Sequence, residues 1–370
     1  MTSLDQHNPA AEPTVPTPLA PTSELDPSRA PLDAERHHAR RWLRWAGRAL
    51  LGLSTLLLVP AAAGAAYQAV ATAGDAAAYA APGRLVDLGG HRLHVDCRGQ
   101  GAPTVVLESA LGAGSATWAW VQPALAPATR VCAYDRAGEG WSDPGPEPRD
   151  AARIAAELRA LLARAGEPGP YVLVGHSFGG LYVRAYAAAY REDVAGIVLI
   201  DASHPDQWSR SPDGPGVQRA NAQSAALAPW LARLGVLRLT GYVAVDPALP
   251  PRQRAELRAQ SDATRTWEGY GAEFRAVDAT MAQVRAAGGL GEMPLVVLTA
   301  TEHGFPAGME QLHRQLQGEL AALSTRSVHR VLPGATHVSP VHDPAQAGAT
   351  AEAIRLIVQA ARTGLLPTAP

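Results

Sequence analysis

The chain has 370 residues, of which 47% are hydrophobic and 18% are charged, and its formal net charge is −2 at pH 7. These values suit one large globular domain with additional segments, and with so small a net charge we expect no nucleic-acid partner. Every basic residue other than histidine is arginine, which excludes enzymes that need a lysine for a Schiff base or for phosphate binding. The 2 cysteines are too few for a thiolate zinc site, and no motif implies a metal or an organic cofactor.

The first segment, residues 1–35, is rich in proline, alanine, serine and threonine and has no apolar periodicity. Such a composition cannot bury enough surface to offset the entropy of ordering, so we expect a disordered tail. A basic cluster comes next, with Arg36, Arg40, Arg41, Arg44 and Arg48.

An uncharged stretch, residues 49–74, comes next and contains the Leu-rich run LLGLSTLLLV. It is long enough to cross about 30 Å of hydrocarbon as a helix, so we expect a transmembrane anchor, with Pro60 tolerated inside it. Arginine before the stretch and Asp75 after it predict a cytoplasmic N-terminus and an extracytoplasmic catalytic domain in the cell membrane. The alternatives are a buried helix of a soluble domain and a cleaved signal peptide, although the region before the stretch is long for a signal.

From residue 83 to residue 361, short apolar runs typical of strands alternate with helical stretches. This alternation predicts a mostly parallel sheet with helices on both faces. An insertion at about residues 202–293 has helical stretches and no comparable strand, so we expect a helical cap, and residues 362–370 form a short tail. The predicted strands are the runs RLVDL, RLHVDC, TVVLES, RVCAYD, YVLVGHS, GIVLID, LVVLTA and SVHRVL.

The strongest motif is the G-x-S-x-G pattern of Gly175, Ser177 and Gly179, which follows the apolar run VLV and precedes the helical run LYVRAYAAAY. A serine on a sharp turn between a strand and a helix leaves no room for neighbouring Cβ atoms, so the flanking glycines are required. The pattern also arises by chance in flexible turns, but the strand before it and the helix after it favour a nucleophile.

With these landmarks the chain, from about Gly83 to Ala361, resembles the α/β-hydrolase fold family, and within it the capped serine ester hydrolases of the AB hydrolase-1 type. The resemblance rests on the nucleophile motif, on Asp135, Gly138, Gly140 and Ser142 in YDRAGEGWSDP, and on Gly334 and His337 in PGATH. It implies an eight-stranded sheet with a cap inserted after the sixth strand. It also implies a serine hydrolase that cleaves a carboxylic ester or similar acyl bond through an acyl-enzyme.

The resemblance assigns His337 as the general base, because it follows the last strand, and His342 is the alternative. Most relatives supply the triad acid after the seventh strand, but here that loop reads LVVLTATEHGF, with Glu302 before His303. Haloalkane dehalogenases instead place the acid at the end of the sixth strand, where this chain has Asp201. We therefore prefer Asp201 as the acid and keep Glu302 as the alternative. The chain is not itself a dehalogenase, since those enzymes need aspartate where Ser177 stands.

An oxyanion hole needs two backbone N–H donors aimed at the tetrahedral intermediate. One is expected from Phe178, directly after the nucleophile. The other is expected from Leu111, because Ser109 and Ala110 replace the His-Gly of many relatives in the loop after the third strand.

The expected cap carries several aromatic residues and leucines, namely Trp208, Trp230, Leu231, Leu234, Leu237, Leu239, Tyr242, Trp267 and Tyr270. They either line a pocket for an apolar or amphiphilic ester or simply pack onto the core. Other acyl chemistry on the same fold, by a thioesterase, amidase, perhydrolase or C–C hydrolase, is an open alternative. A non-catalytic anchored binding protein is a second alternative, which the displaced acid and Ala110 suggest.

The strand order implied by the resemblance puts the strands of Cys97 and Cys132 side by side. Neighbouring strands lie about 4.8 Å apart, so facing cysteines can form a disulfide. We expect this bond because the anchor orientation sends the domain to the oxidising side of the membrane. Two separately buried thiols are the alternative.

Overall fold

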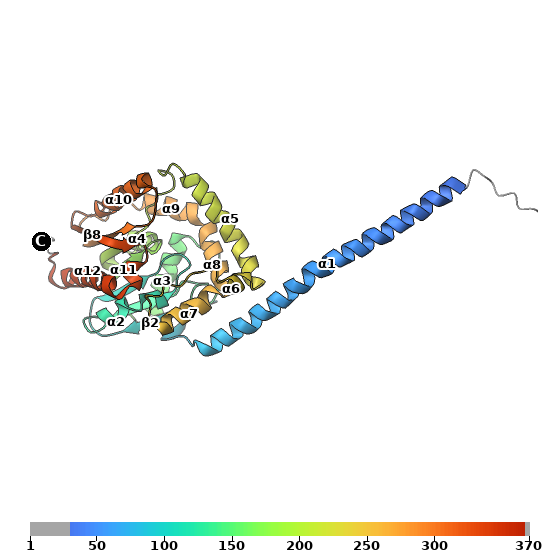
Figure 1. The fold of residues 1–370 in the computed structure, drawn as a ribbon. Coiled ribbons are helices and arrows are strands. Elements are labelled where there is room, and N and C mark those ends of the chain that lie inside the picture. Colours follow the sequence, from blue (N-terminus) through green and yellow to red (C-terminus); the bar gives the residue numbers. More distant parts are fainter. Residues whose placement is uncertain (1–29, 367–370) are drawn as a thin grey trace, which may run out of the picture. The chain divides into compact units, whose positions relative to one another are not determined.

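The computed structural model describes residues 30–366, and the chain divides into two compact units, Met1–Pro60 and Ala61–Pro370. The second unit contains a single sheet whose strand order is β1-β2-β4-β3-β5-β6-β7-β8 (Figure 1). Strand β2 pairs antiparallel with both β1 and β4, and all other pairs are parallel. The expected mostly parallel, eight-stranded sheet is therefore confirmed. The strands are β1 (Arg84–Asp87), β2 (Arg92–Arg98), β3 (Thr104–Glu108), β4 (Val131–Tyr134), β5 (Tyr171–His176), β6 (Val194–Ile200), β7 (Leu295–Glu302) and β8 (Ser327–Thr336).

Helices cover both faces of the sheet, because the central strands are apolar on both sides. Along β5, Val172 and Val174 belong to one buried cluster and Leu173 to the other, as the two-residue period of a strand requires. Helices α2 (Val121–Leu125), α11 (Ser339–His342) and α12 (Pro344–Thr363) lie with the first cluster, and α3 (Ala151–Ala165), α4 (Gly179–Ala189) and α10 (Ala307–Ala321) lie with the second. Two short 3-10 turns, Ser115–Trp118 and Arg191–Asp193, complete the connections.

A helical cap separates β6 from β7, which confirms its expected place after the sixth strand (Figure 1). Its helices are α5 (Gly214–Arg233), α6 (Val236–Thr240), α7 (Pro251–Ser261), α8 (Thr264–Arg275) and α9 (Val277–Ala286). Helix α5 packs on α8, and α9 packs on α3 and α4. The cap is thereby tied to the helix that follows the G-x-S-x-G motif.

The expected disulfide between Cys97 and Cys132 is present. The two residues are register partners in the antiparallel pair of β2 and β4, so their side chains face each other. The bond therefore joins the antiparallel edge of the sheet to its parallel centre.

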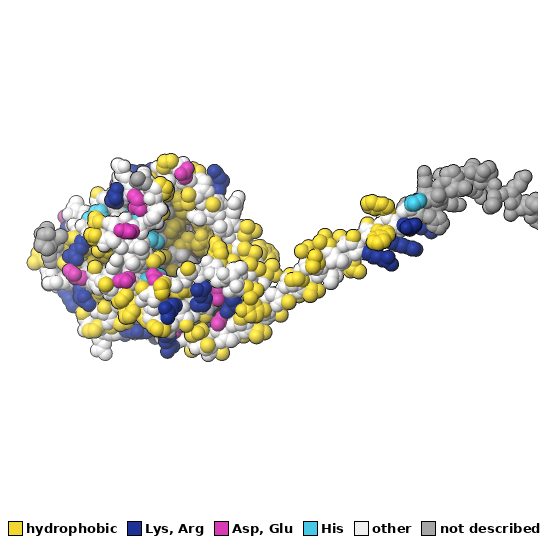
Figure 2. All heavy atoms as spheres, viewed as in Figure 1, with side chains coloured by type: hydrophobic (Ala, Val, Ile, Leu, Met, Phe, Trp, Pro, Cys, Tyr) yellow, Lys and Arg dark blue, Asp and Glu magenta, His cyan; other side chains and the backbone are white. Residues whose placement is uncertain are grey.

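Helix α1 (Ala30–Ala78) contains the predicted anchor and includes a window between Arg40 and Ala78 with mean hydropathy 1.9, apolar enough to cross a membrane. Its leucines from Leu43 to Leu58 are exposed, and Figure 2 shows hydrophobic side chains along it with arginines towards its N-terminal end. Most of the expected disordered tail lies outside the described residues. Residues 30–35, which we assigned to the tail, are helical, because Pro31 stands in the first turn, where proline is tolerated, and good helix formers follow it.

Candidate active site

Ser177 lies on a tight turn between β5 and α4, and its backbone has φ +55°. A Cβ atom at Gly175 would come within 2.6 Å of the Gly179 backbone, and one at Gly179 within 2.5 Å of the Glu108 carbonyl oxygen. Side chains at either position would push the turn away from the sheet. The two glycines therefore allow the strained turn that holds the hydroxyl above the strand ends.

His337 follows β8 directly, and its Nε2 atom lies 3.0 Å from the Oγ atom of Ser177. On its other side, Nδ1 lies 2.6 Å from Oδ2 of Asp201. A carboxylate can only accept, so Nδ1 carries the proton and Nε2 is free to accept one from the hydroxyl. The alternative base, His342, instead faces Asp246 of the cap at 3.5 Å.

Asp201 comes directly after β6, is almost fully buried, and has φ +41°. Its Oδ1 atom accepts a hydrogen bond of 3.0 Å from the backbone N–H of Ala300 on β7. Glu302, the alternative acid, is exposed at the end of β7, and within residues 30–366 it makes no hydrogen bond with His337. The geometry thus brings together Ser177, His337 and Asp201, and leaves Glu302 outside.

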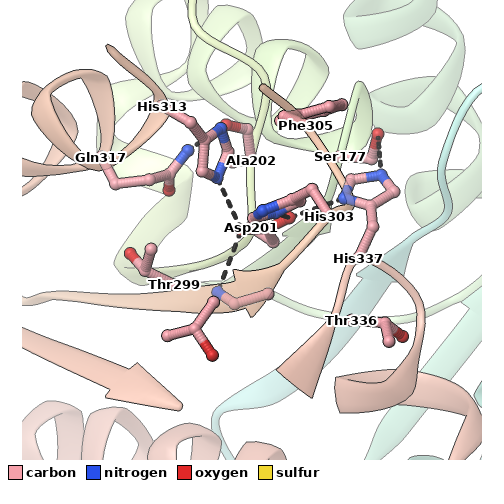
Figure 3. A network of polar contacts seen from close by, with 12 residues as sticks. Ser177, Asp201, Ala202, Thr299, His303, Phe305, His313, Gln317, Thr336 and His337 are labelled. Atoms are coloured by element: carbon pink, nitrogen blue, oxygen red, sulfur yellow. Dashed lines mark hydrogen bonds and ion pairs between the residues drawn. The ribbon is translucent and has the colours of Figure 1, made fainter. Parts of the chain in front are cut away.

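Two further histidines, which we did not assign to the site from the sequence, also contact Asp201. His303 Nε2 lies 2.8 Å from Oδ2, and His313 Nε2, on α10, lies 2.9 Å from Oδ1. Figure 3 shows Asp201 among the three imidazoles, with Ser177 beyond His337. His303 stands in the loop where relatives carry the acid, which was the available signal, whereas nothing in the sequence pointed to His313.

His303 lies between two carboxylates, because its Nδ1 atom is 3.1 Å from Oε2 of Glu310. Only an imidazolium can donate to both, and the hydrogen bond with Asp201 raises the pKa of His303 despite its burial. Burial by itself would raise the pKa of Asp201, but the hydrogen bonds from His303, His313 and His337 outweigh it and hold that pKa far below its usual range. Asp201 is therefore ionised at neutral pH.

His176, which precedes the nucleophile, is buried and lies beside His337. Burial lowers its pKa to about 3, so it is neutral. Its Nε2 atom donates a hydrogen bond of 2.8 Å to the carbonyl oxygen of His337. This bond fixes the backbone of the loop that carries His337.

The two expected oxyanion donors, Leu111 and Phe178, have backbone N–H groups with no hydrogen-bond partner in the described part of the chain. The loop before Leu111 is held by Arg136, a buried residue that we did not single out from the sequence. Its guanidinium donates to the carbonyl oxygens of Ser109 at 2.9 Å and Ala110 at 3.0 Å.

Buried carboxylates on two other elements balance the charge of Arg136. Glu108 on β3 and Glu273 on cap helix α8 each lie 2.7 Å from the guanidinium. Glu273 also accepts a hydrogen bond of 2.8 Å from Tyr182 of α4. The network links the sheet, the cap and the helix after Ser177, and so fixes their relative positions around the oxyanion donors.

A cavity of about 310 Å³ opens onto Ser177, Asp201 and His337. Its remaining walls are largely apolar, with Phe178, Trp208, Val217, Met309, Leu312 and Leu316 among them. A second cavity of about 300 Å³ is lined by Leu111, Tyr242, Trp267 and Tyr270, and Asn221 lines both cavities.

The other large apolar residues of the cap were expected either in a pocket or against the core, but most of them are exposed. Leu237 is buried, whereas Leu231, Leu234 and Leu239 are exposed, so for these three both expectations were wrong. Trp230 is also exposed and lines a separate cavity of about 410 Å³ that does not include Ser177. The reason is that alanines, rather than the large residues, form the buried side of α5.

Asp201, His303 and His313 offer possible metal-ligand atoms that lie within 4.8 Å of one another. These same atoms already form the hydrogen bonds described above, so a metal ion would have to displace them. The arrangement is therefore better suited to holding Asp201 than to holding a cation.

Comparison with known proteins agrees with this architecture. Residues 103–281 match the family model described as the alpha/beta hydrolase fold. A thermophilic esterase from Thermogutta terrifontis is 22% identical, with a TM-score of 0.57, covering 76% of this chain and 99% of that one. At this identity the likeness shows the fold alone.

Curated relatives match over shorter regions. An uncharacterized protein of Schizosaccharomyces pombe is 38% identical over 123 residues, which are 33% of this chain and 22% of that protein. An uncharacterized vacuolar membrane protein of Saccharomyces cerevisiae is 38% identical over 93 residues, which are 25% of this chain and 14% of that protein. The chain therefore matches less than a quarter of the length of either relative. The matched family model, together with the sheet, the cap and the strained turn at Ser177, shows that the chain has the alpha/beta hydrolase fold.

Proposed function

We propose that the protein is a membrane-anchored serine hydrolase that cleaves a carboxylic ester or a similar acyl bond. The observation that carries the proposal is the hydrogen-bonded line from Ser177 through His337 to Asp201, with contacts of 3.0 Å and 2.6 Å. These three residues border a largely apolar cavity, which suits an apolar or amphiphilic substrate.

In the proposed mechanism, the Oγ atom of Ser177 attacks the carbonyl carbon while His337 Nε2 takes the hydroxyl proton. Asp201 keeps His337 in the required tautomer and stabilises the imidazolium that forms. The N–H groups of Leu111 and Phe178 donate to the oxyanion, each worth about 3–4 kcal/mol in the transition state.

His337 then gives its proton to the leaving alcohol, and an acyl group remains on Ser177. A water molecule then attacks the acyl carbon while His337 again acts as base. His337 returns the proton to Ser177 as it leaves, and the carboxylic acid is released. No step needs a metal or an organic cofactor.

The surroundings of Asp201 support its proposed role as the acid. Four donors, the three imidazoles and the N–H of Ala300, fix the carboxylate and keep it ionised. The displaced acid was a reason to consider a non-catalytic binding protein, and the contact between Asp201 and His337 favours the enzyme instead.

Kinetics of point variants test the proposal. Ser177→Ala and His337→Ala should each abolish hydrolysis of p-nitrophenyl acetate while the fold is retained, because the triad acts as one unit. His342→Ala is the matched histidine control and should keep its activity, since His342 faces Asp246 rather than Ser177. Hydrolysis that persists in Ser177→Ala would contradict the mechanism. A panel of thioesters, amides, peracid-forming reactions and C–C substrates then separates the alternative acyl chemistries.

The membrane anchor is proposed from the apolar window in α1, and the membrane-protein name of the Saccharomyces cerevisiae relative supports association with a membrane. The arginines before the window favour a cytoplasmic N-terminus, and the disulfide favours an oxidising compartment for the domain. The full chain should therefore stay with membranes during carbonate washing. Protease added outside intact cells should digest the catalytic domain, and a fully protected domain would overturn the orientation.

A further inference from the structure

Cap helix α5 carries its large apolar side chains on the outside of the protein. Leu227, Trp230, Leu231 and Leu234 follow the i, i+3, i+4, i+7 spacing of one helical face, and their exposed fractions are 59%, 64%, 38% and 37%. The buried residues of the same region are small, chiefly alanines, and pack towards α8. A soluble helix normally shows the opposite arrangement, so the outer face of α5 requires an apolar partner.

The apolar surface continues beyond α5. Leu239 at the end of α6 and Tyr242 just after it are exposed by 68% and 61%. We call the set the cap patch, which consists of Leu227, Trp230, Leu231, Leu234, Leu239 and Tyr242. Figure 2 shows hydrophobic side chains gathered over this edge of the cap.

Most charges around the cap patch are paired. Between Gly214 and Val245 the chain has three arginines and no aspartate or glutamate, but Arg233 pairs with Glu268 of α8 and Arg238 pairs with Asp75 and Asp262. Arg233 also lies over the Trp230 ring at 4.8 Å. An apolar surface with aromatic residues and charged groups at its edge resembles the surfaces that proteins present to the interfacial region of a bilayer.

The last part of α1, which belongs to the same compact unit as the cap, is joined to this patch. Gly64 packs directly against the backbone of Leu234, an approach that a Cβ atom at Gly64 would block. The Leu-rich run of the predicted span ends at Val59, only five residues earlier in the chain. Where that run enters a bilayer, Leu234 is thus held near the same boundary.

Beyond Gly64, helix α1 contacts the cap through polar side chains. Gln68 is buried and donates to the carbonyl oxygen of Asp262 at 2.6 Å, and Asp75 lies 2.7 Å from Arg238. The segment from Gly64 to Asp75 is thus fastened to the cap, next to the cap patch.

A neighbouring face of α5 leads to the nucleophile. Val217 and Asn221 line the cavity at Ser177, and Asn221 and Ser224 line the second cavity, which Tyr242 of the cap patch also lines. One helix thus separates the exposed apolar surface from the two cavities. Tyr242 thus shares the second cavity with both Leu111 and Asn221.

We propose that the cap patch docks into the lipid bilayer that holds α1, and that the enzyme takes bilayer-resident esters from it into the cavity of Ser177. The proposal rests on the proposed membrane-anchored hydrolase, and it adds the surface that meets the lipid and the class of substrate. Such a substrate is an ester with long acyl chains that resides in the membrane.

A fluorescent label tests the docking independently of catalysis. The native cysteines are bonded to each other, so Leu239→Cys in the full chain provides a single site for an environment-sensitive dye. In phosphatidylcholine vesicles we expect a blue-shifted emission that lipids brominated on their acyl chains quench. Glu352→Cys, at an exposed position on α12, is the control and should show neither effect. Equal, water-like emission from the two labels in membrane-bound protein would overturn the docking.

Kinetics test the access of substrate. In the full chain in vesicles, the double variant Trp230→Asp and Leu239→Asp should lower turnover of a long-chain monoacylglycerol in the same vesicles at least about tenfold, since burial of one large apolar side chain is worth more than that factor. Turnover of water-soluble p-nitrophenyl acetate should be unchanged. Val331→Asp, at an exposed apolar position of β8, is the matched control and should affect neither substrate.

These experiments distinguish a failure of the docking proposal from a failure of the proposed hydrolase mechanism. The substrate route would be contradicted if the cap-patch variant lost turnover of the monoacylglycerol and of p-nitrophenyl acetate in the same proportion. It would also be contradicted if the variant kept both activities. Absence of any Ser177-dependent turnover in the unmodified chain would contradict the hydrolase mechanism, and the label at position 239 would still decide whether the patch enters the bilayer.

Discussion

Replacing Asp201 with asparagine isolates the role of its charge, because the two side chains are nearly equal in size. The carboxylate accepts hydrogen bonds from three imidazoles and one backbone N–H, whereas an amide has a single accepting oxygen. We expect charged His303 to take that oxygen, which leaves the NH₂ group against His337. His337 Nδ1 must then accept, so its proton moves to Nε2, where it blocks transfer from Ser177.

We expect Asp201→Asn to lower kcat for p-nitrophenyl acetate about 10⁴-fold, which corresponds to about 5 kcal/mol of transition-state stabilisation. Circular dichroism and thermal melting check that the variant is folded. Glu302→Gln makes the same chemical change at an exposed position and should keep kcat within about twofold. A large loss in Glu302→Gln together with a small loss in Asp201→Asn would refute the reasoning.

His303→Gln removes an imidazolium that donates to both Asp201 and Glu310, so the acid limb of the kcat/KM profile should move to higher pH; an unmoved limb would mean that His303 carries no charge. Arg136→Gln leaves two buried carboxylates without their cation and should lower the free energy of unfolding by about 3–5 kcal/mol in urea titrations. Arg275→Ala, which breaks an ion pair whose two partners are both exposed, should leave the midpoint unchanged, and equal midpoints in the two variants would contradict the role of Arg136. Mass spectrometry after alkylation should find Cys97 and Cys132 joined. For a separation of 35 residues the bond stabilises by about 3.8 kcal/mol in the chain-entropy model, so reductant should lower the midpoint, whereas two alkylated thiols would show no bridge.

The parts of the fold that follow from local patterns were predictable from the sequence. Alternating apolar runs indicated the eight strands, and the glycines around Ser177 indicated a strained turn that the structure contains. The pairing of Cys97 with Cys132 needed more than a pattern. It depended on the strand order of the family that the chain resembles.

Other features could not be read from the sequence because they depend on how distant elements pack. His313 reaches Asp201 only because α10 lies against β7, more than a hundred residues along the chain from Asp201. The spacing of Trp230, Leu231 and Leu234 indicates one helical face but not the side on which the core lies. On α5 the alanine face packs against α8, so the large residues remain outside.

The most direct test of the central claim is to treat the purified full chain with a fluorophosphonate and to identify the modified residue by peptide mass spectrometry. The account predicts one stable adduct, on Ser177, with loss of esterase activity in proportion to labelling and no adduct in Ser177→Ala or His337→Ala. Full activity with Ser177 unlabelled, or equal labelling in His337→Ala, would contradict it.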